Sequence, residues 1–519
     1  MHEANATSRS EHARTLVLLD GLVLMSLGWL VLYTVSKHEP WADEAQAWLV
    51  ARDFGWWQML LAELRYEGHP PFWFALLWPA IHFFRMPYAH LGYLGGSIAI
   101  LGLAMLIFFA PFPRALRYLI ASSFFFLYQY AVIARPYVLM PLLGFGAAYF
   151  YRKGLPRILP FAGCIALLIQ VSSYAAVIAI ALAVVYFLPL VLRWKELAEK
   201  DRQRVIAAGA LVAASLVLVI VVLYPRADSS LMAEATGKTL EQHLQLVLEG
   251  LVGAFADSAF FAVPLLILAA IWAHERQGLM LLTLSVGGAA CVYGFLRGLG
   301  HHQGLITIAF VVFLWAVWPS PEQLQAPTRE SRWIHHGMFV ALLLVFAWHC
   351  SWSYSAIRND WAGPYSGARD AAMFLKSVHA DQVGCRGYSF WAVGVQPYFD
   401  HNIFVNQGGP DSPAAHHFSF DGATPTNVMD AGEIQTGAPL IVAALETAPS
   451  ETATIIEELR NANYRLLRSS DGTRFFKNKA GVHSLYLIFA RTDWILAQRD
   501  KGWNLDSAYP GQQSSLILP

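Results

Sequence analysis

The sequence predicts a polytopic α-helical membrane protein of about 11 to 13 transmembrane helices with a C-terminal soluble α/β domain. Of its 519 residues, 56% are hydrophobic and only 14% are charged, which is far from the average of a soluble domain. Long apolar runs fill residues 1–352, whereas from residue 353 onward they shorten and glycine, aspartate, asparagine and proline become frequent. We therefore expect a transmembrane module at 1–352 and an α/β domain at 353–519.

Charge and cysteine content narrow the classes of partner. Lysine plus arginine and aspartate plus glutamate both number 36, so no excess charge favours nucleic acid. The four cysteines have neither a CxxC motif nor a cysteine–histidine metal spacing. We expect no nucleic acid partner, no disulfide framework and no zinc site.

The first apolar run, residues 15–36, predicts a span that is not cleaved. It is longer than the apolar core of a signal peptide and lacks a small-residue cleavage pattern. Further spans are expected at residues 70–84, 90–110, 115–132, 136–151, 158–171, 174–192, 205–223, 257–273, 279–296, 303–318 and 338–353.

Basic loops set the expected orientation in the plasma (inner) membrane. Residues 192–204 form the most positive loop, which the positive-inside rule places in the cytoplasm together with the amino terminus. Residues 37–69, 225–256 and the tail then lie outside. Twelve crossings would return the tail to the inside, so one segment should not cross. Residues 70–84, short and opened by two prolines, are expected to be a re-entrant or partial helix; alternatively, two short segments form one helix.

The tail has the pattern of a small α/β domain. Strands are expected at 382–388, 402–406, 440–445, 465–468 and 484–490, and amphipathic helices at 368–378 and 450–461. Because the tail lacks a nucleophile or phosphate-loop motif, we expect it to cap the membrane module and bind an acceptor or partner.

Two adjacent acids, Asp43 and Glu44, lie in the first outer loop just after the first span. Acids are costly near hydrocarbon and indicate a functional site. Tryptophan-rich segments at 43–53 and 56–66 predict two short amphipathic helices in the membrane interface. The alternative is that both acids only cap the positive end of the first of these helices.

The order of motifs resembles the C-type membrane glycosyltransferases. A first span, Asp43-Glu44, Gly68-His69-Pro70-Pro71 and then Arg135-Pro136-Tyr137 opening a later span is most similar to the branch of dolichyl-phosphate-mannose protein mannosyltransferases and bacterial aminoarabinose transferases. The resemblance covers about the first 150 residues by motif. It implies a transferase that moves a sugar from a polyprenyl-phosphate donor to an acceptor on the outer membrane face.

The resemblance also implies roles for individual residues. Asp43 falls where these families have a loop acid that acts as general base or holds a metal or the acceptor, with Glu44 beside it. His69 occupies the place of the basic residue before the double proline. Aminoarabinose transferases have Glu-Lys-Pro-Pro there, so Gly68 departs from the pattern, and nearby Glu67 is the candidate substitute.

The chemistry of sugar transfer independently favours these residues. A base must deprotonate the acceptor hydroxyl, and positive charge must stabilise the departing phosphate. Arg135 is suited to bind phosphate oxygens in pairs, although it also fits a snorkelling interfacial arginine. We expect inverting displacement with Asp43 as base and Glu44 assisting, while His69 and Arg135 hold the phosphate. The further candidate substrate contacts are Tyr137, Arg297, His301 and His302.

The sequence leaves open whether a metal is bound and which class of protein this is. The adjacent pair His301 and His302 is a weak candidate for a metal site and is better explained as ordinary polar residues of a loop. Binding of Mg²⁺ or Mn²⁺ at Asp43 is a separate possibility. A polysaccharide polymerase or ligase would use a lipid-diphosphate donor, and a lipid or solute transporter would also bury polar residues. Polar residues here gather in outer loops, which favours the enzyme over a transporter. The sequence does not identify the sugar or the acceptor.

Overall fold

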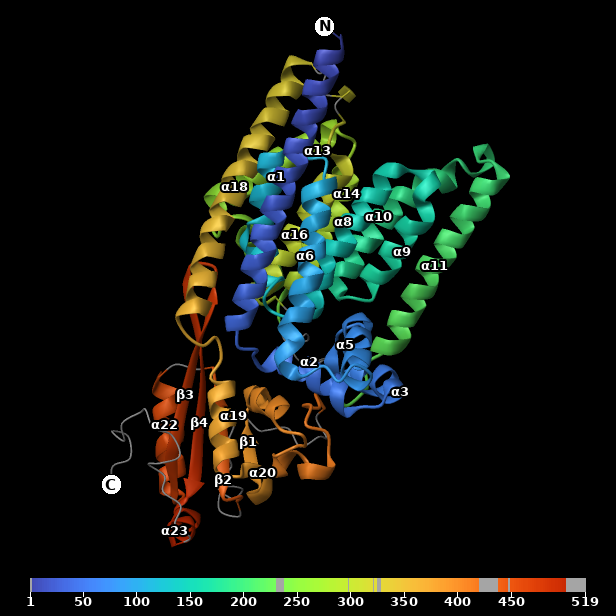
Figure 1. The fold of residues 1–519 in the computed structure, drawn as a ribbon. Helices are drawn as coiled ribbons and strands as arrows, with labels where there is room; N and C mark the ends of the chain where they lie inside the picture. The colour runs from blue at the N-terminus through green and yellow to red at the C-terminus, as the bar shows by residue number, and fades with distance from the viewer. Residues whose placement is uncertain are drawn as a thin grey trace.

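The computed structural model describes residues 2–229, 238–296, 298–320, 322–323, 328–419, 437–446 and 449–500. Figure 1 shows a bundle of long helices, the C-terminal α/β domain beyond one end of it, and the short helices α2, α3 and α5 at that same end of the bundle. The bundle contains α1 (His2–Lys37), α6 (Leu91–Phe109), α7 (Arg114–Ala121), α8 (Leu139–Lys153), α9 (Ile158–Ile169), α10 (Ser173–Leu192), α11 (Glu199–Leu223), α12 (Leu240–Phe255), α13 (Ala259–Glu275), α14 (Leu279–Leu282), α15 (Gly288–Phe295), α16 (Gln303–Val317) and α18 (Arg329–Ala362).

Six of the described helices are long and apolar enough to cross a membrane, or up to seven if α12 and α13, bent by 88° at their junction, form one span. Each expected apolar run contains helix, but several of these helices are short or broken. The run at 115–132, for example, is divided between α7 and the π-helical turn η3 (Phe125–Gln129). The number of crossings therefore stays a prediction. α18 continues through the expected boundary at residue 352 to Ala362.

Helix α5 (Phe72–His82) has 11 residues. At 1.5 Å per residue it is about 16 Å long, roughly half the hydrocarbon thickness of a bilayer. Its Trp78 indole donates to the carbonyl of Phe54 (3.0 Å), and His82 Nε2 is 3.0 Å from the carbonyl oxygen of Ala51. These contacts hold α5 against α2 (Ala42–Asp53) and the residue that follows it, and the partial crossing of α5 stays a prediction.

The loop at residues 37–69 that is predicted to lie outside (the outer loop) contains α2 (Ala42–Asp53), followed by α3 (Trp56–Gln58), the π-helical turn η1 (Met59–Glu63) and α4 (Leu64–Glu67). The expectation of a surface amphipathic helix is wrong for α2, since nine of its 12 residues are buried. It packs between α5 and the 3₁₀ segment η10 (Phe390–Tyr398) of the C-terminal domain. The second segment is more open, with Trp57 69% exposed and Leu61 46% exposed.

The C-terminal domain has a four-stranded sheet in the order β1-β2-β4-β3. Strand β1 (Cys385–Tyr388) is parallel to β2 (Leu440–Leu445), and β4 (Lys479–Arg491) is antiparallel to both β2 and β3 (Tyr464–Phe476). Helices α19 (Ala368–Ser377) and α22 (Pro449–Asn461) confirm the two expected helices, and α20 (Ala380–Val383) and α23 (Thr492–Asp500) are additional.

One expected strand is absent from this domain, and two are longer than expected. Residues 402–406 form no strand; Phe404 makes only an isolated bridge to Cys385 before a 3₁₀ turn. Strands β3 and β4 have 13 residues each, much longer than 465–468 and 484–490. Their hairpin extends toward the helical bundle (Figure 1), where the ring of Phe476 lies 5.4 Å from that of Phe124.

Candidate active site

An aspartate–arginine pair lies at the junction of the bundle and the C-terminal domain. Asp43 is in the first turn of α2, and Arg135 is an extended residue directly before the 3₁₀ turn η4 (Pro136–Val138). Arg135 Nη1 donates to Asp43 Oδ2, and the two side chains are 13% and 19% exposed, respectively. The Arg135 guanidinium also lies 5.5 Å from the centre of the Tyr137 ring. Two residues that are 92 positions apart thus form one charged, partly accessible centre.

Glu44 is fully buried and has a separate set of partners. Its carboxylate accepts hydrogen bonds from the backbone N–H of Trp41 (3.2 Å) and of Ala134 (2.7 Å), and it pairs with His38 Nε2 at 3.2 Å. The bond from Trp41 caps the first turn of α2, and the bond from Ala134 ties that turn to the segment that contains Arg135. The capping interpretation therefore applies to Glu44, whereas Asp43 faces the arginine.

His38 is a buried residue that the sequence did not single out. Its Nδ1 lies 3.0 Å from Asp360 Oδ2, which also accepts from the Tyr128 hydroxyl at 3.0 Å. Burial alone would lower the pKa of His38, but the negative charges of Asp360 and Glu44 raise it to about 10. A protonated His38 thus stands between two buried carboxylates. No sequence pattern indicated this, because Asp360 lies 322 positions away.

A chain of hydrogen bonds brings together three of the predicted substrate contacts. His69 Nε2 lies 3.3 Å from the Tyr137 hydroxyl, which lies 3.0 Å from His302 Nε2. His69 Nδ1 is 3.0 Å from the carbonyl oxygen of Glu67, and the ring of His301 is 4.2 Å from that of His302. Since Arg135 stacks on Tyr137, the chain adjoins the charged pair. The predicted Arg297 lies outside the described residues.

Glu67 is linked through Gln46 to the C-terminal domain. Gln46 Nε2 donates to Glu67 Oε1 (2.5 Å) and to the carbonyl of His416 (2.7 Å). Burial, with the charges of Asp43 and Glu63, raises the pKa of Glu67 to about 8 against the opposing effects of Gln46 and Arg135. Glu67 is therefore largely protonated at neutral pH and is a poor substitute for an anionic metal ligand.

The described residues include no group of three or more histidine, cysteine, aspartate or glutamate side chains arranged to hold a metal ion. Asp43 is paired with Arg135, and Glu44 is occupied by its own donors. This donor set does not fit Mg²⁺ or Mn²⁺, which prefer several oxygen ligands. We assign no step to a metal.

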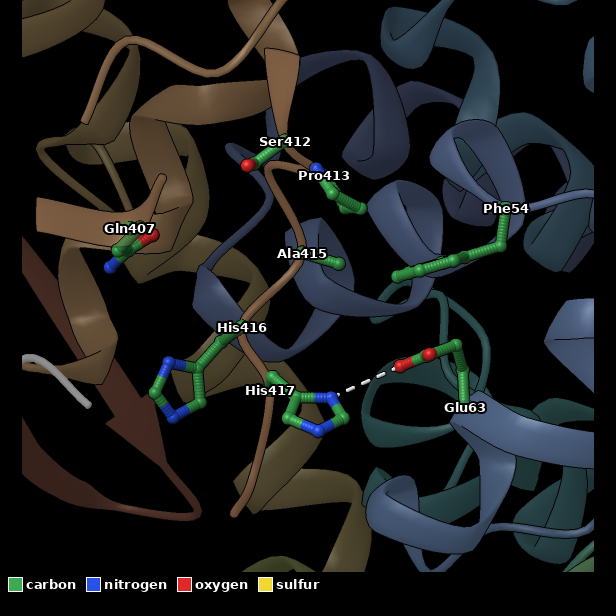
Figure 2. A pocket seen from close by; sticks show the side chains of 8 residues that line it. All are labelled: Phe54, Glu63, Gln407, Ser412, Pro413, Ala415, His416 and His417. Atoms are coloured by element: carbon green, nitrogen blue, oxygen red, sulfur yellow. Dashed lines mark hydrogen bonds and ion pairs between the residues drawn. The ribbon is translucent and has the colours of Figure 1, made fainter. Parts of the chain in front are cut away.

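A pocket of about 240 Å³ lies where Phe54 and Glu63 of the 37–69 loop meet residues 407–417 of the C-terminal domain. Figure 2 shows its lining and the ion pair between His417 Nδ1 and Glu63 Oε2, 3.1 Å apart. The lining residues are Phe54, Glu63, Gln407, Ser412, Pro413, Ala415, His416 and His417. His416 N donates to Gln46 Oε1 at 2.8 Å, which ties one lining residue of the pocket to α2.

The β3–β4 hairpin also reaches the outer loop. The Arg474 guanidinium lies 4.3 Å from the ring of Trp41 and 5.2 Å from that of Trp391, and the two tryptophan rings stack at 5.6 Å. Arg474 Nη2 pairs with Glu446 at 2.5 Å. The sequence did not predict these contacts, because residue 474 lies outside the strands expected at 465–468 and 484–490. The C-terminal domain therefore packs directly against the residue two positions before Asp43.

No family model and no curated protein sequence matches the chain. Among solved structures, it is similar to ArnT from Cupriavidus metallidurans bound to undecaprenyl phosphate, with a TM-score of 0.47, 11% sequence identity, and coverage of 91% of this chain and 97% of that one. A likeness at this identity says nothing about the substrate.

Proposed function

We propose that this chain is an integral membrane glycosyltransferase that moves a sugar from a polyprenyl-phosphate-linked donor to an acceptor on the outer face of the plasma (inner) membrane. The supporting observation is the pairing of Asp43 with Arg135 where the helical bundle meets the C-terminal domain. Both side chains keep some exposure, so a substrate can reach them. The amino terminus would then be cytoplasmic and the C-terminal domain extracytoplasmic.

The two charged groups supply the two requirements of the reaction. Asp43 takes the proton of the acceptor hydroxyl, and the acceptor oxygen bonds to the anomeric carbon as the bond from that carbon to the phosphate oxygen breaks. Arg135 stabilises the departing phosphate; with five N–H donors it can bind phosphate oxygens while remaining near Asp43. Attack opposite the leaving phosphate inverts the anomeric configuration.

The hydrogen-bonded chain His69–Tyr137–His302 (the histidine chain) is proposed to support phosphate binding next to Arg135. His69 is proposed to contact the phosphate, while Tyr137 and His302 fix the orientation of its ring through the two hydrogen bonds at 3.3 and 3.0 Å. His301 and Arg297 are proposed as further donor contacts. Glu44 acts indirectly, because it holds the first turn of α2 in register with the Arg135 segment.

The test is the transfer activity of purified Asp43→Asn with a panel of sugars linked to polyprenyl phosphate. Loss of the base should lower the turnover rate by about 10²- to 10⁴-fold, with the thermal unfolding midpoint unchanged within a few degrees. Glu199→Gln, the same loss of charge at a 74% exposed position, is the matched control. A folded Asp43→Asn protein that transfers sugar at the wild-type rate would refute the assignment. Including diphosphate-linked donors in the panel tests the polymerase or ligase alternative.

A further inference from the structure

The turn between β3 and β4 places a lysine inside the helical bundle. Lys477 is 2% exposed and has a left-handed backbone (φ 58°). Its Nζ donates to the carbonyl of Gly253 (2.7 Å), to Asp257 Oδ1 (2.5 Å) and to Gln303 Oε1 (2.7 Å). The ammonium also lies 4.5 Å from the ring of Trp352. All three hydrogens of the ammonium thus have acceptors from the membrane module.

These acceptors connect the hairpin to the bend between α12 and α13 and to the start of α16. Gly253 and Asp257 lie at the end of α12, where the chain bends by 88° into α13. Gln303 is the first residue of α16 and directly follows His302. A single side chain of the C-terminal domain therefore joins the α12–α13 bend to the start of the helix that follows the histidine pair.

A second residue of the hairpin contacts the turn at 299–303. The ring of Phe476 packs so closely on Gly300 that a Cβ atom there would lie 3.2 Å from the ring. Within the turn, the backbone N–H of Leu299 is 3.3 Å from His302 Nδ1, and the carbonyl of His301 accepts from the Tyr130 hydroxyl. Residues 299–303 are thus clamped between the hairpin tip and the bundle.

Burying a lysine is costly unless the contacts it makes repay the lost hydration. Burial lowers the pKa of Lys477 to about 8, although Asp257 opposes the shift. A methionine of similar length would fill this space more cheaply, so hairpin packing alone does not account for an ammonium here. Its polar contact nearest the histidine pair is the one to Gln303.

We propose that Lys477 is a positioning residue for the donor site: by holding Gln303, the hairpin tip of the C-terminal domain fixes the turn at 299–303 and with it the His302–Tyr137–His69 chain. The inference deepens the proposed function and rests on it. It assigns the C-terminal domain a part in donor binding, in addition to any contact with the acceptor.

The test compares Lys477→Met and Gln303→Met with the control Lys479→Met, an exposed lysine two residues further along the hairpin. Gln303→Met leaves the Lys477–Asp257 pair intact, so it serves even if Lys477→Met fails to fold. Both variants should raise the KM for the polyprenyl-phosphate sugar donor by about 10- to 100-fold, with a smaller change in kcat. Backbone amide exchange at 299–306 should also accelerate, while Lys479→Met matches wild type in every measurement.

A double-mutant cycle with His69→Ala separates positioning from a merely structural role. If Lys477 acts through the histidine chain, adding Lys477→Met to His69→Ala should cost little further kcat/KM. Losses that multiply, or wild-type KM and exchange in folded Lys477→Met and Gln303→Met proteins, overturn the inference. If the wild-type protein uses no donor in the panel, the proposed function fails, and unchanged exchange at 299–306 in Lys477→Met then overturns the clamp as well.

Discussion

Replacing Glu44 by glutamine tests whether the two adjacent acids have different roles. The substitution preserves the shape of the side chain but removes its charge and turns one acceptor oxygen into an NH₂ group. Glu44 is fully buried, and all three of its partners, the N–H groups of Trp41 and Ala134 and the His38 ring, present donors to it. Glutamine cannot satisfy all three, because only one of its two terminal atoms is an acceptor.

The expected loss of stability follows from these contacts. If the glutamine oxygen accepts from Ala134, its NH₂ faces the N–H of Trp41 and protonated His38; if the amide flips, it faces Ala134 instead. Each buried donor left without an acceptor costs about 1–3 kcal/mol, and His38 also loses one of its two carboxylates. We expect the free energy of unfolding to fall by about 3 kcal/mol. Part of this cost is relieved if His38 releases its proton, so the pKa of His38 should also fall.

Equilibrium unfolding in mixed micelles, measured beside sugar transfer, provides the assay. Glu44→Gln should be clearly destabilised and retain part of its activity at low temperature. Asp43→Asn should show the reverse, with near-normal stability and severe loss of transfer. The exposed Glu199→Gln should change neither. A Glu44→Gln protein that unfolds as wild type does, yet loses transfer as completely as Asp43→Asn, would show that Glu44 takes part in the chemistry and that its buried contacts are dispensable.

Two further changes test the surroundings of the site. Gly304→Ala, in the helix that follows His302, places a Cβ atom against the ring of Phe125; we expect a loss of about 1–3 kcal/mol in unfolding free energy, whereas Gly209→Ala, with open space around its Cβ position, should be neutral. Glu67→Gln should flatten the pH dependence of stability. The folded protein holds a proton on Glu67 between the ordinary carboxyl pKa of 4.5 and about 8, so wild-type stability should decline as pH rises through that window. Thermal midpoints from pH 5 to 9 would show this, and an equal slope in the variant would contradict it.

The positions of helices were largely predictable, because apolar runs and helix-breaking residues are local signals. The run at 174–192, for example, corresponds to α10 (Ser173–Leu192), and 440–445 corresponds to β2. The sequence did not predict which segments are buried by distant parts of the chain. α2 was expected to lie at the membrane surface, but the C-terminal domain covers it through η10, which begins at Phe390. The predicted strands at 465–468 and 484–490 are shorter than β3 and β4. Ser470, Asp471 and Gly472, which are residue types common in turns, pair with β4 in the structure.

In the candidate site, too, some residues could be predicted from the sequence and others could not. Asp43 and Arg135 could be proposed together because the resemblance supplied their order and the chemistry required both a base and a positive charge for the departing phosphate. His38 and Lys477 could not, since each has its meaning only through a partner far away: Asp360 for His38 and Asp257 for Lys477, 322 and 220 positions distant. A buried charge paired across such a distance leaves no periodicity or motif in one sequence.

The continuity of α18 bears on how the protein can be divided. This helix has 34 residues and is about 51 Å long at 1.5 Å per residue. It runs from the far end of the bundle to the start of the C-terminal domain (Figure 1), and its last turn holds Asp360 against His38. A chain ended at residue 352 would retain the apolar runs but lose that aspartate along with the hairpin. Expression of the membrane part alone should therefore yield a protein that enters the membrane but lacks the Asp360 contact to His38, the residue that pairs with Glu44.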